Sequence, residues 1–562
     1  MAADAHSVPF IHRSGAQADF VQRASSQPGA STRTTASMGA SSSPDRNVLM
    51  TDTAATPSYP AAYTELMRLT REAATLGSAA SLLGWDQETF MPPAAAAFRA
   101  EQLAMLSTMV HERHVSPRVA ELLAQCEADT ALAADPTAAA NVRELRRDFE
   151  RSTRLSSALV HEITETSSRA MHVWRDAREK NDFAAFAPWL EKTVELVRRK
   201  AEAYGWAADG VAYDALLQEF EPGMTTARVT ATFDALRAGL APLIRDVAGS
   251  GVTPDTAWQT VRVPVERQAA FNQGIVRRMG FDLDAGRLDI SAHPFCDGMA
   301  PGDTRLTTRY AEDQFPSALS GTMHETGHAL YEQNLPKAAH FGEPVAQAAS
   351  TGIHESQSRM WENFVGRSRP FWEWALPELQ RAFDVPELSR LDVDTAYRGM
   401  NALHPSLIRI ESDEATYNLH IMLRFDLERA LLSGELKVAD LPAAWNERMR
   451  ADLGVEVPDD AHGCLQDIHW SMGAFGYFPT YTLGNLYAAQ FWAAIREALP
   501  GLNEDLRRGE FGSLLAWLKE NVHANGRRYT APELCERMTG RPLSHEPLLR
   551  YLEAKVRPIY GL

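Results

Sequence analysis

From about residue 61 onward, apolar residues recur three and four positions apart along most of the chain, which is the spacing of one buried helix face. This pattern predicts helices over 61–85, 186–206 and 226–248, and one long helix, either continuous or interrupted, over 141–182. Prolines and glycines lie between these runs, where helices are expected to end. No repeat of fixed period marks a solenoid, so the sequence predicts a mainly α-helical protein.

Residues 286–313 break the helical pattern, because polar and apolar residues alternate there. Turn-forming residues, DGMAPGD at 297–303, lie in the middle of this stretch. Alternation with a period of two is typical of strands, and a central turn joins neighbouring strands into a hairpin. We therefore expect one small antiparallel sheet directly before the next helix.

The first 57 residues differ in composition from the rest, since they are rich in Ala, Ser, Thr and Gly and show no sustained apolar period. Such a composition buries too little apolar surface to fold. We interpret residues 1–57 as a disordered N-terminal extension and residues 58–562 as one helical domain. With a few arginines and few acids, the composition of this extension also resembles that of an organelle-transit segment. Alternatively, translation starts at Met50, directly before the first structured segment.

Composition narrows the classes of function. The 562 residues are 45% hydrophobic and carry a formal net charge of −17, which disfavours binding to nucleic acid. No apolar run of about 18 residues is present, so no membrane span is expected. The cysteines form no CxxC pair, which favours free thiols in the reducing cytoplasm over a disulfide framework. They are Cys126, Cys296, Cys464 and Cys535.

The strongest chemical signal is the stretch GTMHETGHALYEQN at 321–334. His324 and His328 are four residues apart, so on a helix both imidazoles face one side and can bind one metal ion. Glu325 cannot fully share that side, and it can instead serve as the base for the water that the metal activates. The alternative is a pair of solvated histidines on an ordinary helix.

A catalytic zinc site needs a third protein ligand and an open position. The metzincin extension would place a histidine at 334, and Asn334 excludes that class. We expect Glu355, on a second helix over 351–364, as the third ligand, although it could instead form an ordinary ion pair with Arg359. The downstream candidates are His340, Glu343, Glu355 and Glu362.

Several further blocks carry a resemblance to a known family. In chain order these blocks are WDQETFMP (85–92), HPF (293–295), DTRLTT (303–308), HETGH (324–328), HESQSR (354–359), IRIESDEATYNLHI (408–421) and QDIHWSMGAFGYFPTYTLGN (466–485). With them the chain resembles the carboxypeptidase Taq family of metallocarboxypeptidases from about residue 60 to its end. One departure is Ser412, where the family pattern leads us to expect alanine.

The resemblance implies an all-helical fold like that of neurolysin and angiotensin-converting enzyme, with a deep groove over the metal. It also implies a cytoplasmic homodimer that binds one divalent ion, Zn²⁺ or Co²⁺. The implied activity is the release of single amino acids from peptide C-termini with broad specificity.

The reaction needs donors for the tetrahedral oxyanion besides the metal. His469, Tyr477 and Tyr481 in the stretch HWSMGAFGYFPTY are our candidates. Packing of these aromatic side chains in the core is the alternative.

A carboxypeptidase must also bind the free C-terminal carboxylate, and the planar fork of an arginine suits this group. Arg409 matches the family motif and is our first candidate, while Arg305 is the second. Arg409 could instead pair with Asp413 on a helix. His293 could line the substrate pocket or only hold the edge of the sheet.

Two other functions remain open from the sequence. One is an endo-acting or dipeptide-releasing zinc peptidase of the same helical superfamily. The other is a catalytically inactive helical protein that only binds peptides, although Glu325 and all the expected ligands are present.

Overall fold

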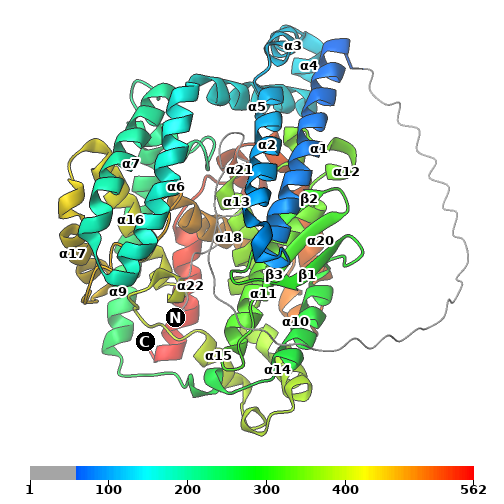
Figure 1. Cartoon of the computed structure of the whole chain (residues 1–562). Coiled ribbons are helices and arrows are strands. Elements are labelled where there is room, and N and C mark those ends of the chain that lie inside the picture. Colours follow the sequence, from blue (N-terminus) through cyan, green and yellow to red (C-terminus); the bar gives the residue numbers. More distant parts are fainter. Residues whose placement is uncertain (1–58) are drawn as a thin grey trace, which may run out of the picture.

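The computed structural model describes residues 59–562, and helices dominate this part of the chain (Figure 1). The mainly α-helical fold expected from the sequence is therefore confirmed. The predicted disorder of residues 1–57 lies outside the described residues and stays a prediction. Within residues 59–562, no helix is long and apolar enough to cross a membrane.

The described part of the chain before the sheet is built from helices. Its helices are α1 (Ala61–Thr89), α2 (Ala96–His114), α3 (Pro117–Glu127), α4 (Thr130–Ala134), α5 (Pro136–Arg154), α6 (Ser157–Lys180), α7 (Phe183–Tyr204), α8 (Ala212–Leu217), α9 (Thr226–Gly249) and α10 (Val265–Met279). The stretch 141–182, for which one long helix or an interrupted one stood open, is divided between α5 and α6. Ser156 begins α6 as its N-cap, because the Ser156 hydroxyl accepts a hydrogen bond from the backbone N–H of Leu159.

Helices resume after the sheet. They are α11 (Phe315–Asn334), α12 (Lys337–His340), α13 (Thr351–Arg359), α14 (Arg369–Phe383), α15 (Val393–Met400), α16 (Thr416–Ser433), α17 (Leu441–Leu453), α18 (Pro479–Ala498), α19 (Leu502–Arg507), α20 (Gly512–Asn521), α21 (Ala531–Thr539) and α22 (Glu546–Tyr560). A π-helical turn, Met360–Val365, continues α13. The predicted HETGH helix is α11, and the predicted next helix is α13 with this turn.

Three strands form the sheet: β1 (Gly286–Ile290), β2 (Cys296–Ala300) and β3 (Asp303–Thr308), in the order β1-β3-β2. β2 and β3 form an antiparallel hairpin, whereas β1 pairs with β3 in parallel. The predicted small sheet is therefore confirmed, but the antiparallel pairing expected for it is wrong for β1. Alternation of apolar and polar residues identifies strands but does not specify their direction.

The connection 291–295 accounts for the mixed sheet, because it wraps round the end of β3. The N–H of Ser291 donates to the carbonyl of Thr308 over 3.2 Å, and the N–H of Thr307 donates to the carbonyl of Phe295 over 2.8 Å. This wrap carries the chain from one edge of β3 to the other. The turn between β2 and β3 is shorter than the stretch DGMAPGD and uses Gly302 at φ +76°.

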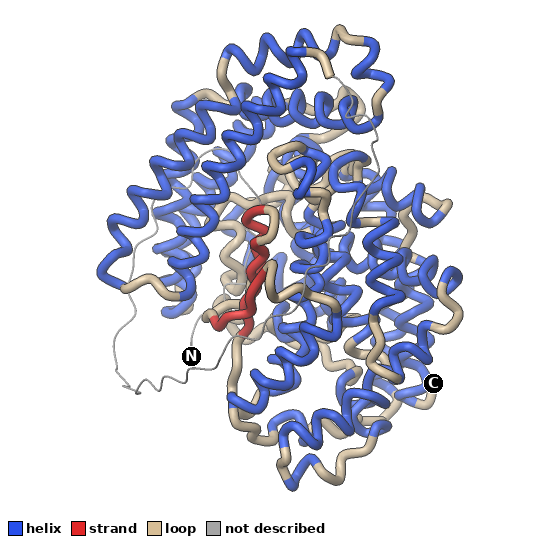
Figure 2. Tube along the Cα trace, turned by 90° about the vertical axis from the view of Figure 1, so that its right-hand side faces the viewer, coloured by secondary structure: helices blue, strands red, loops and turns tan. Residues whose placement is uncertain are grey.

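The elements fall into two groups with three helices between them (Figure 1). The sheet lies with α1, α2, α10, α11 and α20 on one side, and α6, α7, α9, α16 and α17 lie on the other. Helices α13, α18 and α22 run between the two groups. Figure 2 shows the strands surrounded by helices on several sides, so the sheet lies within the helical body next to α11.

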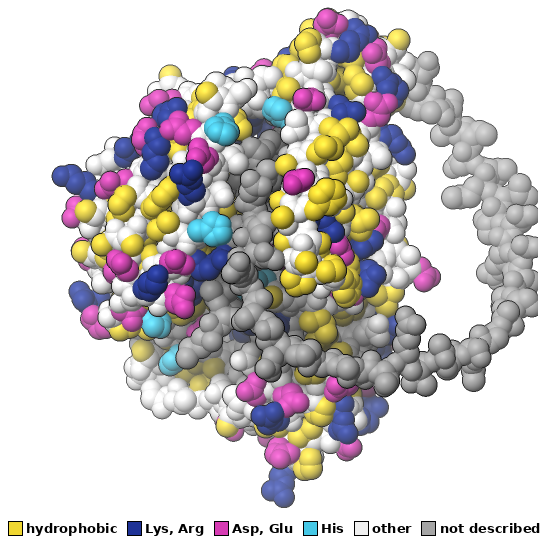
Figure 3. Space-filling view, in the orientation of Figure 1, with side chains coloured by type: hydrophobic (Ala, Val, Ile, Leu, Met, Phe, Trp, Pro, Cys, Tyr) yellow, Lys and Arg dark blue, Asp and Glu magenta, His cyan; other side chains and the backbone are white. Residues whose placement is uncertain are grey.

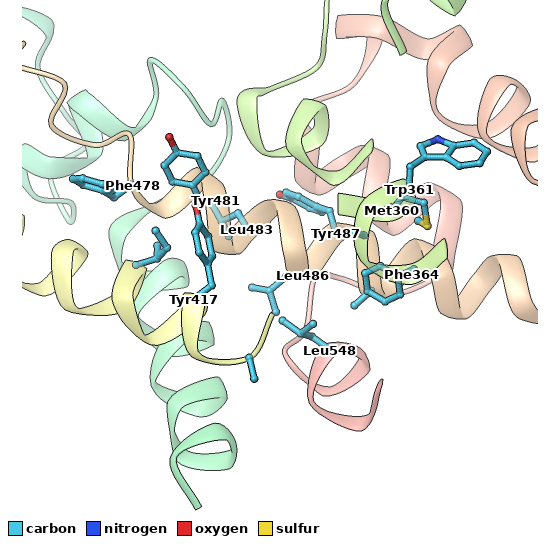
Figure 4. Close-up of a cluster of buried hydrophobic side chains, with 14 of the residues drawn as sticks. Met360, Trp361, Phe364, Tyr417, Phe478, Tyr481, Leu483, Leu486, Tyr487 and Leu548 are labelled. Carbon is cyan, nitrogen blue, oxygen red and sulfur yellow. The ribbon is translucent and has the colours of Figure 1, made fainter. Parts of the chain in front are cut away.

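The helix α18 forms the centre of the core, since it is buried on nearly every side. Leu483, Leu486 and Tyr487 on this helix are fully buried. They pack in a cluster with Trp361 of the π-helical turn and Leu548 of α22 (Figure 4). The same helix lies against α13, so a buried helix supports the helix that carries Glu355.

Helices α1 and α2 form a hairpin with an apolar outer surface. Figure 3 shows apolar side chains gathered over these two helices. In this hairpin Leu82, Phe90, Phe98 and Met105 are all exposed, and Met105 reaches 67% exposure. On α2 only Ala96 and Ala100 are buried, and its other residues are exposed or only partly covered by the described part of the chain.

Candidate active site

The helix α11 holds His324 and His328 on one face, with their ring centroids 4.9 Å apart. Glu355 reaches them from α13. Its Oε2 atom lies 3.6 Å from Nε2 of His324 and 3.5 Å from Nε2 of His328. The structure thus brings together the three residues that the sequence indicated as metal ligands, with one ligand atom of each within 4.8 Å of the others.

The chemistry of this donor set fits a zinc-type ion, since two imidazole nitrogens and one carboxylate oxygen are ligands that zinc prefers. Two ligand atoms at about 2.0–2.1 Å from a tetrahedral zinc lie roughly 3.3–3.4 Å apart. The separations between Glu355 Oε2 and the two Nε2 atoms are close to this value. His324, His328 and Glu355 could therefore hold one divalent metal.

Glycines allow the helices to come close enough for this arrangement. A Cβ atom on Gly327 would lie 2.5 Å from the carbonyl oxygen of Gln357 in α13. A Cβ atom on Gly484 of α18 would lie 2.6 Å from Cγ of Glu355. Both positions therefore require glycine, and these two glycines let α11, α13 and α18 approach one another closely.

A carboxylate also orients the first histidine. Nδ1 of His324 lies 2.8 Å from Oε2 of Glu362, which also accepts a hydrogen bond from Arg359 over 3.1 Å. Burial alone would raise the pKa of Glu362, but Arg359 and His324 lower it to about 2. Glu362 was one of the open candidates for the third ligand, and the structure places it behind His324 instead.

The second histidine is oriented by another histidine. Nδ1 of His328 lies 2.5 Å from Nδ1 of His354. Nε2 of His354 lies 2.8 Å from Oε1 of Glu332, which forms an ion pair with Lys337. Burial, assisted by His354, lowers the pKa of His328 to about 3, so its imidazole is neutral, as a metal ligand must be.

Glu325 is buried beside these residues and is only 6% exposed. Burial raises the pKa of its carboxyl to about 7, while nearby His324 lowers it and Glu355 and Glu362 raise it. A carboxyl with a pKa near neutrality can accept and return a proton, which is the property of a general base.

The other open ligand candidates lie in a separate contact. Nδ1 of His340 lies 2.9 Å from Oε2 of Glu343, and the same oxygen accepts a hydrogen bond from Asn141 of α5 over 2.7 Å. Glu343 is therefore bonded to protein groups rather than simply solvated, and neither residue belongs to the cluster around His324.

Arg409 lies in a 3₁₀ turn before α16 and is only 2% exposed. It does not pair with Asp413, which instead accepts hydrogen bonds from backbone N–H groups at the start of α16. Its Nε and Nη2 donate to Oδ1 of Asp467 over 3.0 and 2.7 Å, and its Nη1 donates to the hydroxyl of Tyr417 over 3.0 Å.

Asp467 is shared between two arginines, since its Oδ2 accepts a hydrogen bond from Nε of Arg424 over 2.6 Å. Burial would raise the pKa of Asp467, but Arg409 and Arg424 hold it well below its usual range. Two guanidinium groups against one carboxylate leave one positive charge in excess. Burial and Arg409 lower the pKa of neighbouring His469 to about 3, so His469 is neutral.

The predicted oxyanion donors lie beside this charged cluster. Nε2 of His469 lies 3.3 Å from the hydroxyl of Tyr481, whose ring is 5.3 Å from that of Tyr477. Both tyrosines are buried, so they also pack in the core as the alternative interpretation proposed. Figure 4 shows Tyr417 and Tyr481 next to each other.

Tyr417 connects the two halves of the site. The guanidinium of Arg359, which binds Glu355, lies 4.7 Å from the centre of the Tyr417 ring. The guanidinium of Arg409 lies 5.9 Å from the same centre. The candidate metal ligands and the arginine cluster are therefore neighbours across a single aromatic side chain.

Arg305 and His293 lie at the sheet. Nε and Nη2 of Arg305 donate to the two carboxylate oxygens of Asp303 over 2.7 and 2.8 Å, and its guanidinium stacks 4.8 Å from the Trp85 ring. His293 lies in the connection that wraps round β3, and its carbonyl accepts a hydrogen bond from the hydroxyl of Ser291. The structure thus places both residues in contacts separate from those of Arg409.

The sequence interpretation missed several residues that contact the site. Spacing could have identified Glu332, which is four residues after His328 on the same helix face. The others come from separate segments and offer no spacing signal. They are His354, Tyr417, Arg424 and Asp467.

Comparisons with known proteins identify the family of this chain. A profile of the carboxypeptidase Taq (M32) metallopeptidase family matches residues 65–556. Thermostable carboxypeptidase 1 of Thermus thermophilus is 45% identical over 510 residues, which cover 89% of this chain and 99% of that protein. Carboxypeptidase 1 of Bacillus subtilis is 38% identical over 499 residues, which cover 89% and 98%.

The fold is also similar to solved structures. The crystal structure of the M32 carboxypeptidase from Deinococcus radiodurans R1 has a TM-score of 0.86 and 40% sequence identity, covering 90% of this chain and 100% of that one. A Pyrococcus furiosus carboxypeptidase structure has a TM-score of 0.86 and 35% identity, covering 89% and 99%. This chain therefore belongs to the carboxypeptidase Taq (M32) metallopeptidase family and is a metallocarboxypeptidase.

Proposed function

We propose that this metallocarboxypeptidase releases single amino acids from peptide C-termini with broad specificity, using one divalent ion bound by His324, His328 and Glu355. The observation that carries the proposal is the convergence of these three ligand atoms within 4.8 Å of one another. Zn²⁺ is the ion that the two imidazoles and one carboxylate favour, and Co²⁺ is the alternative. When bound by these residues, such an ion would supply Lewis-acid chemistry, activating a water molecule and polarising the scissile carbonyl.

Glu325 is the proposed general base. It takes a proton from the attacking water and then passes that proton to the leaving amine. The burial of Glu325 and its pKa of about 7 support both steps, because the carboxyl changes protonation state near neutral pH. The buried surroundings also keep bulk water away from the transferred proton.

Tyr481 and Tyr477 are the proposed hydrogen-bond donors to the tetrahedral oxyanion. When Nε2 of neutral His469 carries the proton, it donates to the Tyr481 oxygen 3.3 Å away. The hydroxyl proton of Tyr481 then remains available for the substrate. In this arrangement His469 orients Tyr481, and the two tyrosines supply the stabilisation of developing charge.

Arg409 is the proposed partner of the substrate's terminal carboxylate. The excess positive charge of Arg409 and Arg424 over Asp467 supports this role, because a buried uncompensated charge needs a counter-ion. Asp467 holds the Arg409 guanidinium in one orientation before the substrate arrives. Arg305 remains the second candidate, and its fork is bound to Asp303 as that of Arg409 is bound to Asp467. His293 is a further proposed contact to the substrate from the sheet side.

The products of a short peptide test the mode of cleavage. A peptide with a blocked N-terminus is incubated with the protein, and product masses are followed over time. Successive losses of one residue from the C-terminus are expected. Release of dipeptides, or cuts within the chain, would support the related endo-acting or dipeptide-releasing activities instead. The Glu325→Gln variant serves as the control for contaminating peptidases.

The cytoplasmic homodimer is a further proposal that follows from the family resemblance. All four cysteines are buried free thiols, which agrees with a reducing compartment. Sedimentation of the purified protein should give twice the mass of one 62.1 kDa chain. A single-chain mass at micromolar concentration would refute the dimer without affecting the proposed chemistry.

A further inference from the structure

Four side chains form a buried row that ends at His328. Nδ1 of His328 lies 2.5 Å from Nδ1 of His354, and Nε2 of His354 lies 2.8 Å from Oε1 of Glu332. Glu332 is paired with Lys337, whose Nζ also donates to the carbonyl of Gly298 over 2.9 Å. The two histidines are at most 7% exposed, so water does not replace these contacts.

The hydrogen bonds in this row can be satisfied in one way when a metal is bound at Nε2 of His328. That nitrogen then has no proton, so Nδ1 carries the proton of the neutral ring and donates to His354. Nδ1 of His354 must accept, which places the proton of its neutral ring on Nε2. This second proton is donated to the carboxylate of Glu332, whose charge is balanced by Lys337.

Backbone geometry holds the charged end of the row in place. A Cβ atom on Gly298 of β2 would lie 2.0 Å from Oε2 of Glu332 and 2.4 Å from Nζ of Lys337. The strand therefore passes directly against the ion pair. This contact fixes Glu332, which in turn fixes the tautomer of His354.

We propose that His354 is a positioning residue for the metal: with Glu332 and Lys337 it fixes the tautomer and ring orientation of His328. The proposal rests on the metal ligation proposed above. As a rule, a histidine that binds a metal donates its second N–H to a neighbouring acceptor. Here the proposed acceptor is another histidine. The proposal also explains why the buried ion pair of Glu332 and Lys337 lies behind the neutral ligand His328. The ion pair orients the imidazole of His354, which lies between them.

The structure offers a matched control for this role. His523 is another buried histidine beside the same aromatic ring, since the Tyr331 ring centroid is 5.3 Å from His354 and 5.2 Å from His523. Nε2 of His523 bonds to the side chain of Gln357, which is not one of the proposed ligands. Removing either imidazole leaves a similar hole, but only one of them contacts His328.

The test compares zinc affinity with the stability of the metal-free protein. The zinc dissociation constant is measured by competition with a chelator for the native protein and for His354→Leu, His354→Gln and His523→Leu. His354→Leu should weaken zinc binding by about 10–100-fold. His354→Gln, whose amide oxygen can accept from His328, should retain more affinity. His523→Leu should leave the zinc affinity unchanged, even if it lowers the thermal midpoint of the metal-free protein as much as His354→Leu does.

Equal loss of zinc affinity in His354→Leu and His523→Leu, or no loss in either, would overturn the proposal. If His354→Leu does not fold, Glu332→Gln provides the same comparison, because it keeps the acceptor and removes the charge. Its Co²⁺ absorption spectrum should differ from that of the native protein, and an identical spectrum would contradict the role. Failure of the metal site itself is distinguishable, since native protein and His324→Ala would then bind zinc equally.

Discussion

Nε of Arg359 donates to Oε1 of Glu355 over 2.7 Å, while the other carboxylate oxygen, Oε2, faces the two histidines of α11. From the sequence, metal ligation and an ion pair with Arg359 stood as alternatives for Glu355. In the structure the two carboxylate oxygens serve the two contacts separately. Arg359 outweighs the effect of burial and holds the pKa of Glu355 well below its usual range, so the carboxylate stays ionised. Its Oε2, which also accepts a hydrogen bond from the Ser358 hydroxyl over 2.9 Å, faces the site.

Replacing the proposed base should separate metal binding from turnover. Glu325→Gln keeps His324, His328 and Glu355 and removes the proton acceptor. It should retain the metal and lose at least about 100-fold in kcat, the lower end of general-base effects. Metal content and peptide hydrolysis are measured on the same sample. His324→Ala is the counterpart and should lose both metal and activity. Near-native rates for Glu325→Gln would exclude the proton-transfer role.

Two glycines of α11 should respond oppositely to alanine. A Cβ on Gly327 meets the backbone of α13, so Gly327→Ala should destabilise the protein by about 1–3 kcal/mol and weaken metal binding. A Cβ on Gly321 meets nothing within 4 Å, so Gly321→Ala should be neutral or stabilise by up to about 1 kcal/mol through helix propensity. Denaturant unfolding checks both variants, and equal effects would contradict the close helix contact.

A buried acid should make stability depend on pH. Glu428 accepts hydrogen bonds from Tyr213, Trp470 and the N–H of Gly476, and it thereby fixes the loop that carries His469. Burial is the dominant influence and raises its pKa from 4.5 to about 7. Between these two pH values the folded protein holds a proton that the unfolded chain has released. The contribution of Glu428 to stability therefore falls as pH rises from 4.5 to about 7 and is constant above that.

The variant Glu428→Gln should remove this dependence, because an amide does not titrate. Unfolding free energies of native protein and variant are measured across the same pH range. Their difference should change with pH only between 4.5 and about 7. Parallel stability profiles would show that Glu428 does not titrate in this range.

The N-terminal prediction is tested by truncation. A chain that begins at Met50 should fold and hydrolyse peptides like the full chain, because residues 1–57 carry no core-forming pattern. Thermal midpoints and rates of the two proteins are compared. A large drop in either quantity would mean that this segment packs against the helical body.

Local patterns in the sequence predicted local features well. The helical period located α1, α7 and α9, and the i, i+4 spacing placed both α11 histidines on one face. The helical pattern of residues 351–364 also placed Glu355 on a second helix. Each of these features depends on residues within one or two helical turns, and such residues constrain one another directly.

Contacts between distant segments were not predictable in the same way. Arg409 pairs with Asp467, 58 residues further along, and not with nearby Asp413. The parallel pairing of β1 with β3 depends on a wrap of five residues that alternation does not reveal. Periodicity identifies the buried face of an element, but which distant segment covers that face is decided by the packing of the whole fold.

Recognition of the peptide end decides the central claim, that Arg409 binds the terminal carboxylate and so restricts cleavage to the C-terminus. A bidentate contact of this kind contributes roughly 1.5–3 kcal/mol, so its loss lowers kcat/KM about tenfold to over a hundredfold. Amidation of the peptide and the variant Arg409→Ala should each cause this loss. The two losses should not add, because both remove the same contact.

The most direct measurement is kcat/KM for native protein and Arg409→Ala, each on a matched pair of acid and amide peptides. We expect the native protein to prefer the acid strongly and Arg409→Ala to cleave both peptides at the same low rate. Additive losses would exclude Arg409 as the carboxylate partner and make Arg305 the better candidate. Equal cleavage of acid and amide by the native protein would contradict recognition of the terminal carboxylate altogether.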